Sequence, residues 1–240
     1  GVLHLAGVIK GKTRRAFEVA NVMGTAHLID AIARAGTNRL VHVSSLAARH
    51  PHLSDYAYTK AVSETLVKGA PCAWTIIRPP AVYGPGDRET LAFFKSVRLG
   101  LAPVPNAASR LSLIYVDDLA RALIAAVESP LSGMCWEPDD GRPGGHTLPD
   151  IYRTIARAMD CPPPRLVPVP APVLSLAAGV NRLASLVTGK APMLSPGKVR
   201  ELCHPDWLSG GSPGLDWNAR TDIEQGMTVA AHWYRRNGWL

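Results

Sequence analysis

The sequence predicts an α/β fold in which helices cover both faces of a parallel sheet. Short, continuous apolar runs at 40–43 and 73–78 are typical of buried strands. Between such runs lie segments such as 13–35, whose apolar residues recur with helical period. Strands that are apolar on both sides must be covered on both faces, as in parallel sheets. With 240 residues, 47% of them hydrophobic, the chain can bury one large core or a core plus a lobe.

The first half of the chain is predicted to contain three strands and two helices. They are strands at 2–6, 40–43 and 73–78 and helices at 13–35 and 55–68. Gly36 ends the first helix, because glycine adopts the left-handed conformation that closes a helix. Asp55 can cap the second helix. Pro79 and Pro80 stop the third strand, because proline lacks the backbone donor that a sheet requires.

The second half is predicted to be more irregular. The expected elements are a helix at 87–100, a Pro-rich loop at 101–110, a strand at 111–116, a helix at 119–128 capped by Asp117 and Asp118, a strand at 134–136, and helices at 148–159 and 222–236. A stiff connector at 161–172, with one β pairing at 166–167, precedes an apolar helix at 173–187. That helix is too short to span a bilayer, which favours a lid or interface helix, although its exposed side could touch a lipid surface.

Tyr56 and Lys60 carry the chemistry that the sequence predicts. They stand four residues apart on a predicted helix and therefore share one face. An ammonium one turn away stabilises the phenolate, which would lower the phenol pKa from about 10 towards neutrality. The strand at 40–43 ends at Ser44 and Ser45, where a hydroxyl could hold a substrate oxygen against the phenol. Hydride transfer at a carbinol carbon requires this arrangement.

These residues resemble the short-chain dehydrogenase/reductase superfamily, and their neighbours resemble its extended branch, the NAD-dependent epimerase/dehydratases. Further segments follow in that family's order over nearly the whole chain: His4-Leu5-Ala6-Gly7, Asn21-Val22-Met23-Gly24-Thr25, residues 78–86, residues 116–120 and the terminal Trp233-Tyr234-x-x-x-Gly238-Trp239. The resemblance implies a Rossmann-like doubly wound parallel sheet with a small, mostly helical C-terminal substrate lobe. It divides the chain into a partial NAD(P)-binding domain, 1–82 and 113–137, and a substrate-binding lobe, 83–112 and 138–240.

The glycine-rich turn of that family has no match in this sequence. No G-x-x-G-x-x-G occurs in the 240 residues, and Gly1 begins inside an apolar run without an initiator methionine. We therefore expect the chain to lack the N-terminal glycine-rich βα units, whose turn holds the dinucleotide pyrophosphate. The choice between NAD and NADP is made in the same region, so the expected cofactor is NAD or NADP.

The resemblance assigns roles to matching residues. Tyr56 exchanges the proton, Lys60 lowers its pKa and binds the nicotinamide ribose, and Ser45 holds the substrate oxygen. The cofactor-binding residues it implies are His4, Leu5, Ala6, Gly7, Ser44, Tyr56, Lys60, Pro79, Pro80, Ala81 and Val82. Tyr83 is expected on the substrate side together with Ser45. Three residues also have a purely structural explanation: His4 could only pack the strand, Asn21 could be a surface side chain, and Arg78 could only end a strand.

The expected function is that of an NAD(P)-dependent oxidoreductase, epimerase or dehydratase. Its substrate would be a secondary alcohol or ketone, either of a sugar nucleotide or of a hydrophobic, steroid-like or isoprenoid-linked molecule. The alternative is a non-catalytic dinucleotide-binding sensor or scaffold, which the presence of Ser45, Tyr56 and Lys60 disfavours. A third hypothesis is that a chain without the phosphate-binding turn binds no cofactor.

Composition argues against several other partners. The net charge is +7, but the basic residues are scattered, which is typical of a solvated surface and predicts no nucleic-acid partner. The four cysteines form no C-x-x-C pair, so neither zinc nor disulfides are predicted and a cytoplasmic location is expected. His50 and His52 lack a carboxylate at ligand spacing, so no metal is expected. The expected partners are a small-molecule substrate and, through helices 13–35 and 55–68, a second copy in a homodimer, with no stable membrane anchor.

Overall fold

The computed structural model describes residues 1–188 and 194–240, apart from the side chains of 182–184 and 186–188. Its central element is a four-stranded sheet with the strand order β1-β2-β3-β8. The strands are β1 (Val2–His4), β2 (Arg39–Val43), β3 (Ala73–Ile77) and β8 (Met134–Trp136). Every neighbouring pair is parallel. The predicted parallel sheet of a Rossmann-like α/β fold is therefore confirmed.

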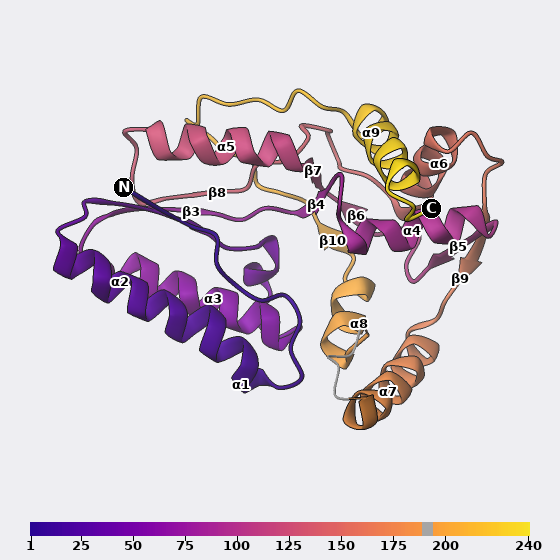
Figure 1. The fold of residues 1–240 in the computed structure, drawn as a ribbon, viewed down its shortest axis with the longest axis horizontal. Coiled ribbons are helices and arrows are strands. Elements are labelled where there is room, and N and C mark those ends of the chain that lie inside the picture. The colour runs from indigo at the N-terminus through magenta and orange to yellow at the C-terminus, as the bar shows by residue number, and fades with distance from the viewer. Residues whose placement is uncertain (189–193) are drawn as a thin grey trace.

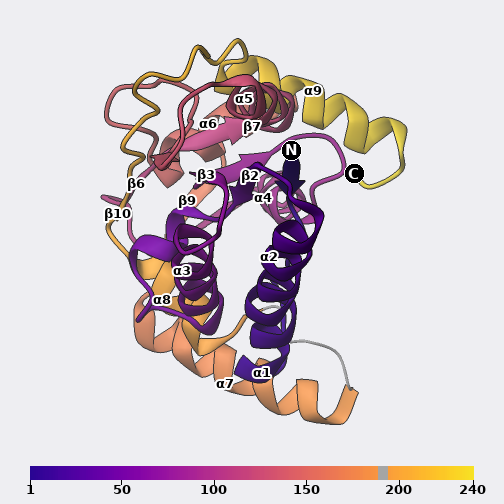
Figure 2. The same cartoon turned by 90° about the vertical axis from the view of Figure 1, so that its left-hand side faces the viewer.

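Helices cover both faces of this sheet (Figures 1 and 2). One side carries α1 (Arg14–Phe17), a π-helical segment (Glu18–Met23), α2 (Gly24–Ala35) and α3 (Asp55–Lys68), and the other side carries α5 (Val116–Glu128). Successive strand residues point to opposite faces. Leu40 accordingly packs with Ile32 and Val67. Val41, the next residue, packs with Leu119 of α5. Burial on both faces explains why the strand sequence is apolar without alternation.

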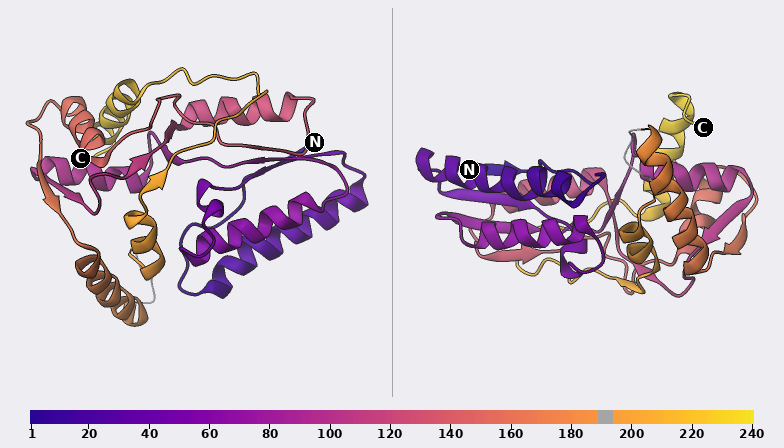
Figure 3. Two further views of the ribbon diagram at one scale, coloured as in Figure 1. Left: turned by 180° about the vertical axis from the view of Figure 1, so that it is seen from behind. Right: turned by 90° about the horizontal axis from the view of Figure 1, so that it is seen from below.

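A mostly helical lobe lies beside the sheet domain (Figure 3). Its helices are α4 (Arg88–Arg98), α6 (Leu148–Ala158), α7 (Ala171–Thr188), α8 (Pro196–Cys203) and α9 (Ile223–Arg236). Two parallel strand pairs belong to it: β5 (Leu101–Val104) with β9 (Arg165–Pro168), and β6 (Arg110–Leu111) with β10 (Asp206–Trp207). A third pair, β4 (Ala81–Tyr83) with β7 (Leu113–Tyr115), packs on both the sheet core and the lobe core. Phe94, Ile155 and Tyr234, each 0% exposed, form the centre of the lobe core.

The helix predicted at 13–35 forms with both predicted ends. The Thr13 hydroxyl accepts the backbone N–H of Ala16 at 3.3 Å, and Gly36 closes the helix with φ of 63°. Its middle, Glu18–Met23, is π-helical rather than α-helical and carries Asn21. Short π-helical segments insert into α-helices frequently at functional sites. The hydrophobic period of the sequence does not reveal this change from an α-helix to the wider π-helix.

Two segments differ from the predictions for local reasons. Ser54, rather than Asp55, is the N-cap of α3, and its hydroxyl accepts the backbone N–H of Ala57 at 3.0 Å. Both residue types cap helices well, so the sequence does not choose between them. Residues 101–110, predicted as a loop, contain β5, because β9 pairs with it. Pairing with a strand more than sixty residues away is set by tertiary context and not by local propensity. Helix α8 and strand β10 were also not predicted.

Asp118 does not cap its helix as predicted. Helix α5 begins at Val116 rather than Leu119, so Asp118 lies inside the first turn. Its carboxylate is 0% exposed and accepts the backbone N–H groups of Arg220 and Thr221 at 2.9 and 3.0 Å. Asp118 therefore binds backbone N–H groups, as a helix cap does, but those of another segment. Asp118 binds the backbone of Arg220 and Thr221 to α5 instead of capping the N-terminus of the helix.

Two histidine rings lie next to each other on the face of the sheet that α2 and α3 cover. His4 and His42 are paired in the register of β1 and β2, and their ring centroids lie 5.1 Å apart. His4 Nε2 lies 3.0 Å from the Thr25 hydroxyl, and His42 Nε2 lies 3.1 Å from the Ser63 hydroxyl. Burial lowers the pKa of both rings, that of His42 to about 2, and the charge of Lys60 lowers both further. Both imidazoles are therefore neutral at neutral pH.

We predict that acid destabilises this fold at a pH where most carboxylates are still ionised. His42 has a pKa of about 2 in the folded state, whereas an unfolded histidine titrates near 6.5. The neutral His42 side chain contributes fully to the stability of the fold above about pH 6.5. Below that value, the unfolding free energy falls by about 1.4 kcal/mol per pH unit. Urea unfolding between about pH 7 and about pH 5 measures this slope. The variant His42→Gln should show a smaller slope, and equal slopes would contradict the prediction.

Candidate active site

A cavity of about 210 Å³ opens at the carboxyl ends of β1 and β2, beside α3. Its walls are formed by Leu5, Gly7, Val8, Ile9, Asn21, Val43, Ser44, Ser45, Tyr56, Lys60, Pro79, Pro80, Val82 and Leu119. In open α/β sheets, ligands bind at this end of the strands. The structure thus brings together Ser45, Tyr56 and Lys60, the three residues predicted to be catalytic.

Tyr56 and Ser45 meet in this cavity. Ser45 is the last residue before a 3₁₀ turn (Leu46–Arg49), and its hydroxyl accepts the backbone N–H of Ala47 at 3.2 Å. The side chains of Ser45 and Tyr56 line the same cavity. Burial raises the pKa of Tyr56, although the Ser45 hydroxyl opposes the rise. The pKa of Tyr56 is therefore raised and not lowered as predicted, because burial disfavours the phenolate.

Lys60 lies on the same side of α3 as Tyr56 but deeper. Its side chain is 5% exposed, and its ammonium donates to the carbonyl of Val43, the last residue of β2, at 2.7 Å. Burial lowers the pKa of Lys60 to about 8, while the carboxylate of Glu64 opposes this shift. An ammonium has three donors, so two remain for a ligand in the cavity.

A buried ionic network lies behind the serines. The Glu64 carboxylate, 3% exposed, accepts from the Ser44 hydroxyl at 2.5 Å and from two nitrogens of Arg78 at 2.9 and 2.7 Å. Arg78 also donates to Glu137 at 3.2 Å, and Arg49 approaches the same carboxylate at 3.4 Å. The hydrogen bonds to Glu64 raise the pKa of Arg78 above its already high ordinary value. Arg78 therefore anchors α3 to the sheet and does more than end a strand.

Asn21 holds the turn that follows β1. Its amide accepts the backbone N–H of Val8 at 2.8 Å and donates to the Val8 carbonyl at 3.1 Å and to the Thr59 hydroxyl at 3.1 Å. It is 2% exposed, so the interpretation as a surface side chain is wrong. A Cβ on Gly7 would lie 3.1 Å from the Asn21 amide oxygen and 3.9 Å from the Lys60 ammonium. Glycine is favoured here because a side chain would crowd the Asn21 amide.

Four predicted site residues do not line the cavity. His4 points from the sheet towards α2, where it bonds to Thr25 as described above, and Ala6 and Ala81 are exposed. Tyr83, expected on the substrate side, is 2% exposed in the core of the lobe, and its hydroxyl lies 3.4 Å from the Asp222 carbonyl. Burial raises its pKa. The turn signal after Val82 was visible in the sequence, but the direction of the Tyr83 side chain depends on the packing of α9.

Five wall residues are not among the predicted site residues: Val8, Ile9, Asn21, Val43 and Leu119. Val8 and Ile9 directly follow the predicted His4–Gly7 segment, so their position was the available signal. Leu119 comes from the opposite face of the sheet, on α5, and no local pattern connects it with the site.

The histidines of the loop 50–52 lie near the lobe. The His50 ring centroid is 6.1 Å from that of His52 and 4.3 Å from that of His204. In the part of the chain that the structure describes, no group of three or more His, Cys, Asp or Glu side chains is placed to hold a metal ion.

The fold and the cavity define a class, the α/β proteins that bind a dinucleotide at the carboxyl edge of a parallel sheet. The residues present fit a nicotinamide dinucleotide. Gly7 lines the cavity, the Lys60 ammonium has donors left over, and Ser45 and Tyr56 line the same space. The sequence comparison is more specific. The model of the NAD dependent epimerase/dehydratase family matches residues 1–135, and the chain belongs to this family.

The relatives of this chain include enzymes with lipid substrates in their names. It is 38% identical over 240 residues to the ceramide reductase of Caulobacter vibrioides, an alignment that covers 99% of this chain and 75% of the relative. It is 25% identical to the decarboxylating sterol-4-alpha-carboxylate 3-dehydrogenase of Saccharomyces cerevisiae, over 97% of this chain and 76% of the relative. The family depends on NAD, so the expectation of a nicotinamide cofactor is confirmed.

Solved structures share the fold. The structure of MoeE5 in complex with UDP-glucose and NAD superimposes with a TM-score of 0.73 at 18% identity, over 98% of this chain and 79% of the other. At such low identity the likeness concerns the fold and not the substrate.

We predict that Glu64→Ala strongly destabilises the protein. The substitution leaves the Ser44 hydroxyl and one side of the Arg78 guanidinium without their acceptor. Breaking a buried ion pair in this way costs about 3–5 kcal/mol of unfolding free energy. Urea unfolding followed by circular dichroism measures the loss. The matched control is Glu128→Ala, which removes an exposed carboxylate on α5 and should change stability by less than about 0.5 kcal/mol.

Proposed function

We propose that this protein is an NAD(P)-dependent oxidoreductase that reduces a ketone, or oxidises the corresponding secondary alcohol, on a hydrophobic, lipid-like substrate. The observation that carries the proposal is the meeting of Ser45, Tyr56 and Lys60 in one cavity at the carboxyl end of the sheet. Backbone groups already hold the Ser45 hydroxyl and the Lys60 ammonium, so this part of the arrangement is organised in advance of ligand binding.

Each of the three residues has a defined part in this proposal. Ser45 holds the substrate oxygen beside the Tyr56 phenol. The raised pKa keeps Tyr56 protonated at neutral pH, so the phenol can donate its proton to that oxygen, which favours the direction of ketone reduction. The Lys60 ammonium offers its free donors to ribose hydroxyls and places a positive charge near the phenol as the proton leaves. When bound, the nicotinamide supplies the hydride.

The substrate class rests on the cavity and on the relatives. Val8, Ile9 and Leu119 add apolar side chains to the wall. The ceramide and the sterol in the names of the two relatives are lipids, which supports a hydrophobic ketone or alcohol. A sugar nucleotide, present in several structures that share the fold, is the second candidate, but those structures are at most 18% identical.

We predict that Tyr56→Phe abolishes turnover and leaves cofactor binding intact. The substitution removes the proposed proton donor, and the loss of a general acid typically lowers the rate at least about 100-fold. Nicotinamide absorbance is followed with long-chain ketones, sterols and sugar nucleotides, and calorimetry measures binding of NAD and NADP. Unchanged turnover in Tyr56→Phe would refute the proposed mechanism. Cofactor binding by the wild-type protein without turnover of any substrate would favour a non-catalytic dinucleotide sensor.

We predict that activity is lost on the alkaline side near pH 8. Because burial lowers the pKa of Lys60 to about 8, its positive charge disappears as the pH rises through that value. The quantity to measure is kcat/KM, which reports groups of the free enzyme. A kcat/KM that stays constant up to about pH 10, the ordinary pKa of a lysine, would contradict this role.

The pairing of two copies through helices 13–35 and 55–68 stays a prediction. These segments place exposed apolar or aromatic side chains on the surface at Val19, Met23 and Tyr58, with exposed fractions of 49, 38 and 36%. Arg14 lies over the Tyr58 ring at 3.7 Å. Such side chains support a subunit contact, which light scattering on the purified protein would measure.

A further inference from the structure

Helix α7 carries an apolar stripe that faces away from the rest of the protein. Val173, Leu176 and Val180 are spaced by three and four residues, so they lie on one helix face. Their exposed fractions are 55, 73 and 61%. Ala178, on the opposite face, is 0% exposed. The helix packs against α8 and lies at the edge of the molecule in Figures 1 and 2.

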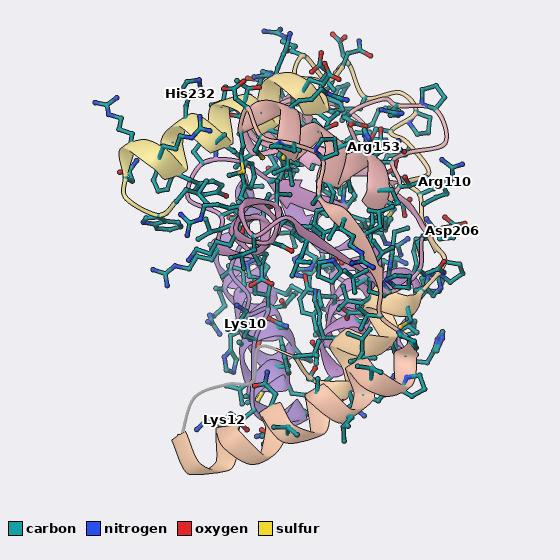
Figure 4. All side chains as sticks on the ribbon, turned by 90° about the vertical axis from the view of Figure 1, so that its right-hand side faces the viewer. Lys10, Lys12, Arg110, Arg153, Asp206 and His232 are labelled. Atoms are coloured by element: carbon teal, nitrogen blue, oxygen red, sulfur yellow. The ribbon has the colours of Figure 1, made fainter. Side chains whose placement is uncertain are left out.

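The chain around this stripe is basic. From 161 to 200 the sequence contains no aspartate or glutamate, whereas it contains the five basic residues Arg165, Arg182, Lys190, Lys198 and Arg200. Lys198 lies 3.4 Å from Glu201, and the other side chains described in this segment, those of Arg165 and Arg200, form no ion pair among the described residues. Lys12 lies at the same end of the molecule as α7 (Figure 4) and likewise forms no ion pair within the described part of the chain. An apolar helix face among unbalanced positive charges is the pattern that binds an anionic lipid surface.

We propose that α7 docks this protein on the surface of a bilayer that contains anionic lipids. Val173, Leu176 and Val180 insert between the headgroups, and the neighbouring cations contact the phosphates. The helix would lie along the surface and not cross it: among residues 1–188 and 194–240, no helix has the length and apolarity that a membrane crossing needs. The surface is separate from the catalytic cavity, and the proposal does not depend on the reductase activity.

A second copy of the chain is a poorer occupant of this stripe. A symmetric dimer would bring the acid-free, basic segments of both copies face to face, so their charges would repel. Stable dimers also bury roughly 800 Å² per partner, which three side chains on one helix do not supply. A bilayer has neither limitation, because its phosphates neutralise the charge and its acyl region accepts a narrow apolar stripe.

Vesicle sedimentation without cofactor or substrate tests the proposal. The wild-type protein should bind vesicles of phosphatidylcholine mixed with phosphatidylglycerol, and bind phosphatidylcholine alone at least about fivefold less, as expected for each cation near an anionic surface. Added salt should weaken the binding. The double variant Leu176→Asp with Val180→Asp should bind at least about tenfold less. The matched control is Val229→Asp, which changes a side chain 47% exposed on α9, at the opposite end of the molecule, and should bind like the wild type.

Several outcomes would overturn the proposal. The first is that the wild-type protein does not bind the mixed vesicles, and the second is that the double variant binds them as well as the wild type. The third is a wild-type dimer in light scattering that becomes a monomer in the double variant. That result would assign the stripe to a second copy. Circular dichroism checks the fold of each variant, and Leu176→Ser with Val180→Ser replaces the aspartate pair where that pair does not fold. Turnover of a water-soluble ketone is measured alongside. Vesicle binding without turnover would leave the docking proposal standing, and turnover without vesicle binding would leave the reductase proposal standing.

Discussion

The site depends on one buried carboxylate. Glu64 lies one turn beyond Lys60 on α3 and receives hydrogen bonds from Ser44 at the end of β2 and from Arg78 just after β3. These contacts fix the helix against two strand ends at once. Tyr56 and Lys60 lie on the same helix, and Ser45 follows Ser44 directly. The distances among the proposed catalytic groups are therefore set by an interaction that itself takes no part in the chemistry.

Burial determines the electrostatics of this region. Lys60 is a buried cation beside two histidines that stay neutral, and its nearest carboxylate, Glu64, is shared with Arg78. The low polarity that lowers the pKa of Lys60 also raises that of Tyr56. A protonated phenol and a lysine that titrates near neutrality suit proton donation to a ketone better than proton removal from an alcohol. The same burial makes the fold sensitive to acid through His42.

The lobe contributes differently from the sheet domain. Its core around Phe94 and Tyr234 is closed, and Tyr83 belongs to that core and not to the cavity. Helix α7 stands apart from this core and exposes its apolar side. Surface apolarity that is confined to one helix face differs from scattered exposed leucines, which are common on soluble proteins and require no explanation.

The sequence alone determined most of the strands and helices, the parallel sheet, and the choice of Ser45, Tyr56 and Lys60 as candidate catalytic residues, because hydrophobic period, turn residues and the Tyr-x-x-x-Lys spacing are local properties. It could not determine the pairing of β5 with β9, the entry of Leu119 into the cavity wall or the direction of Tyr83, since each depends on a partner far away in the chain. The pKa of Tyr56 belongs to the same group. Spacing predicted that Lys60 lowers this pKa, whereas burial of the phenol in the folded chain raises it.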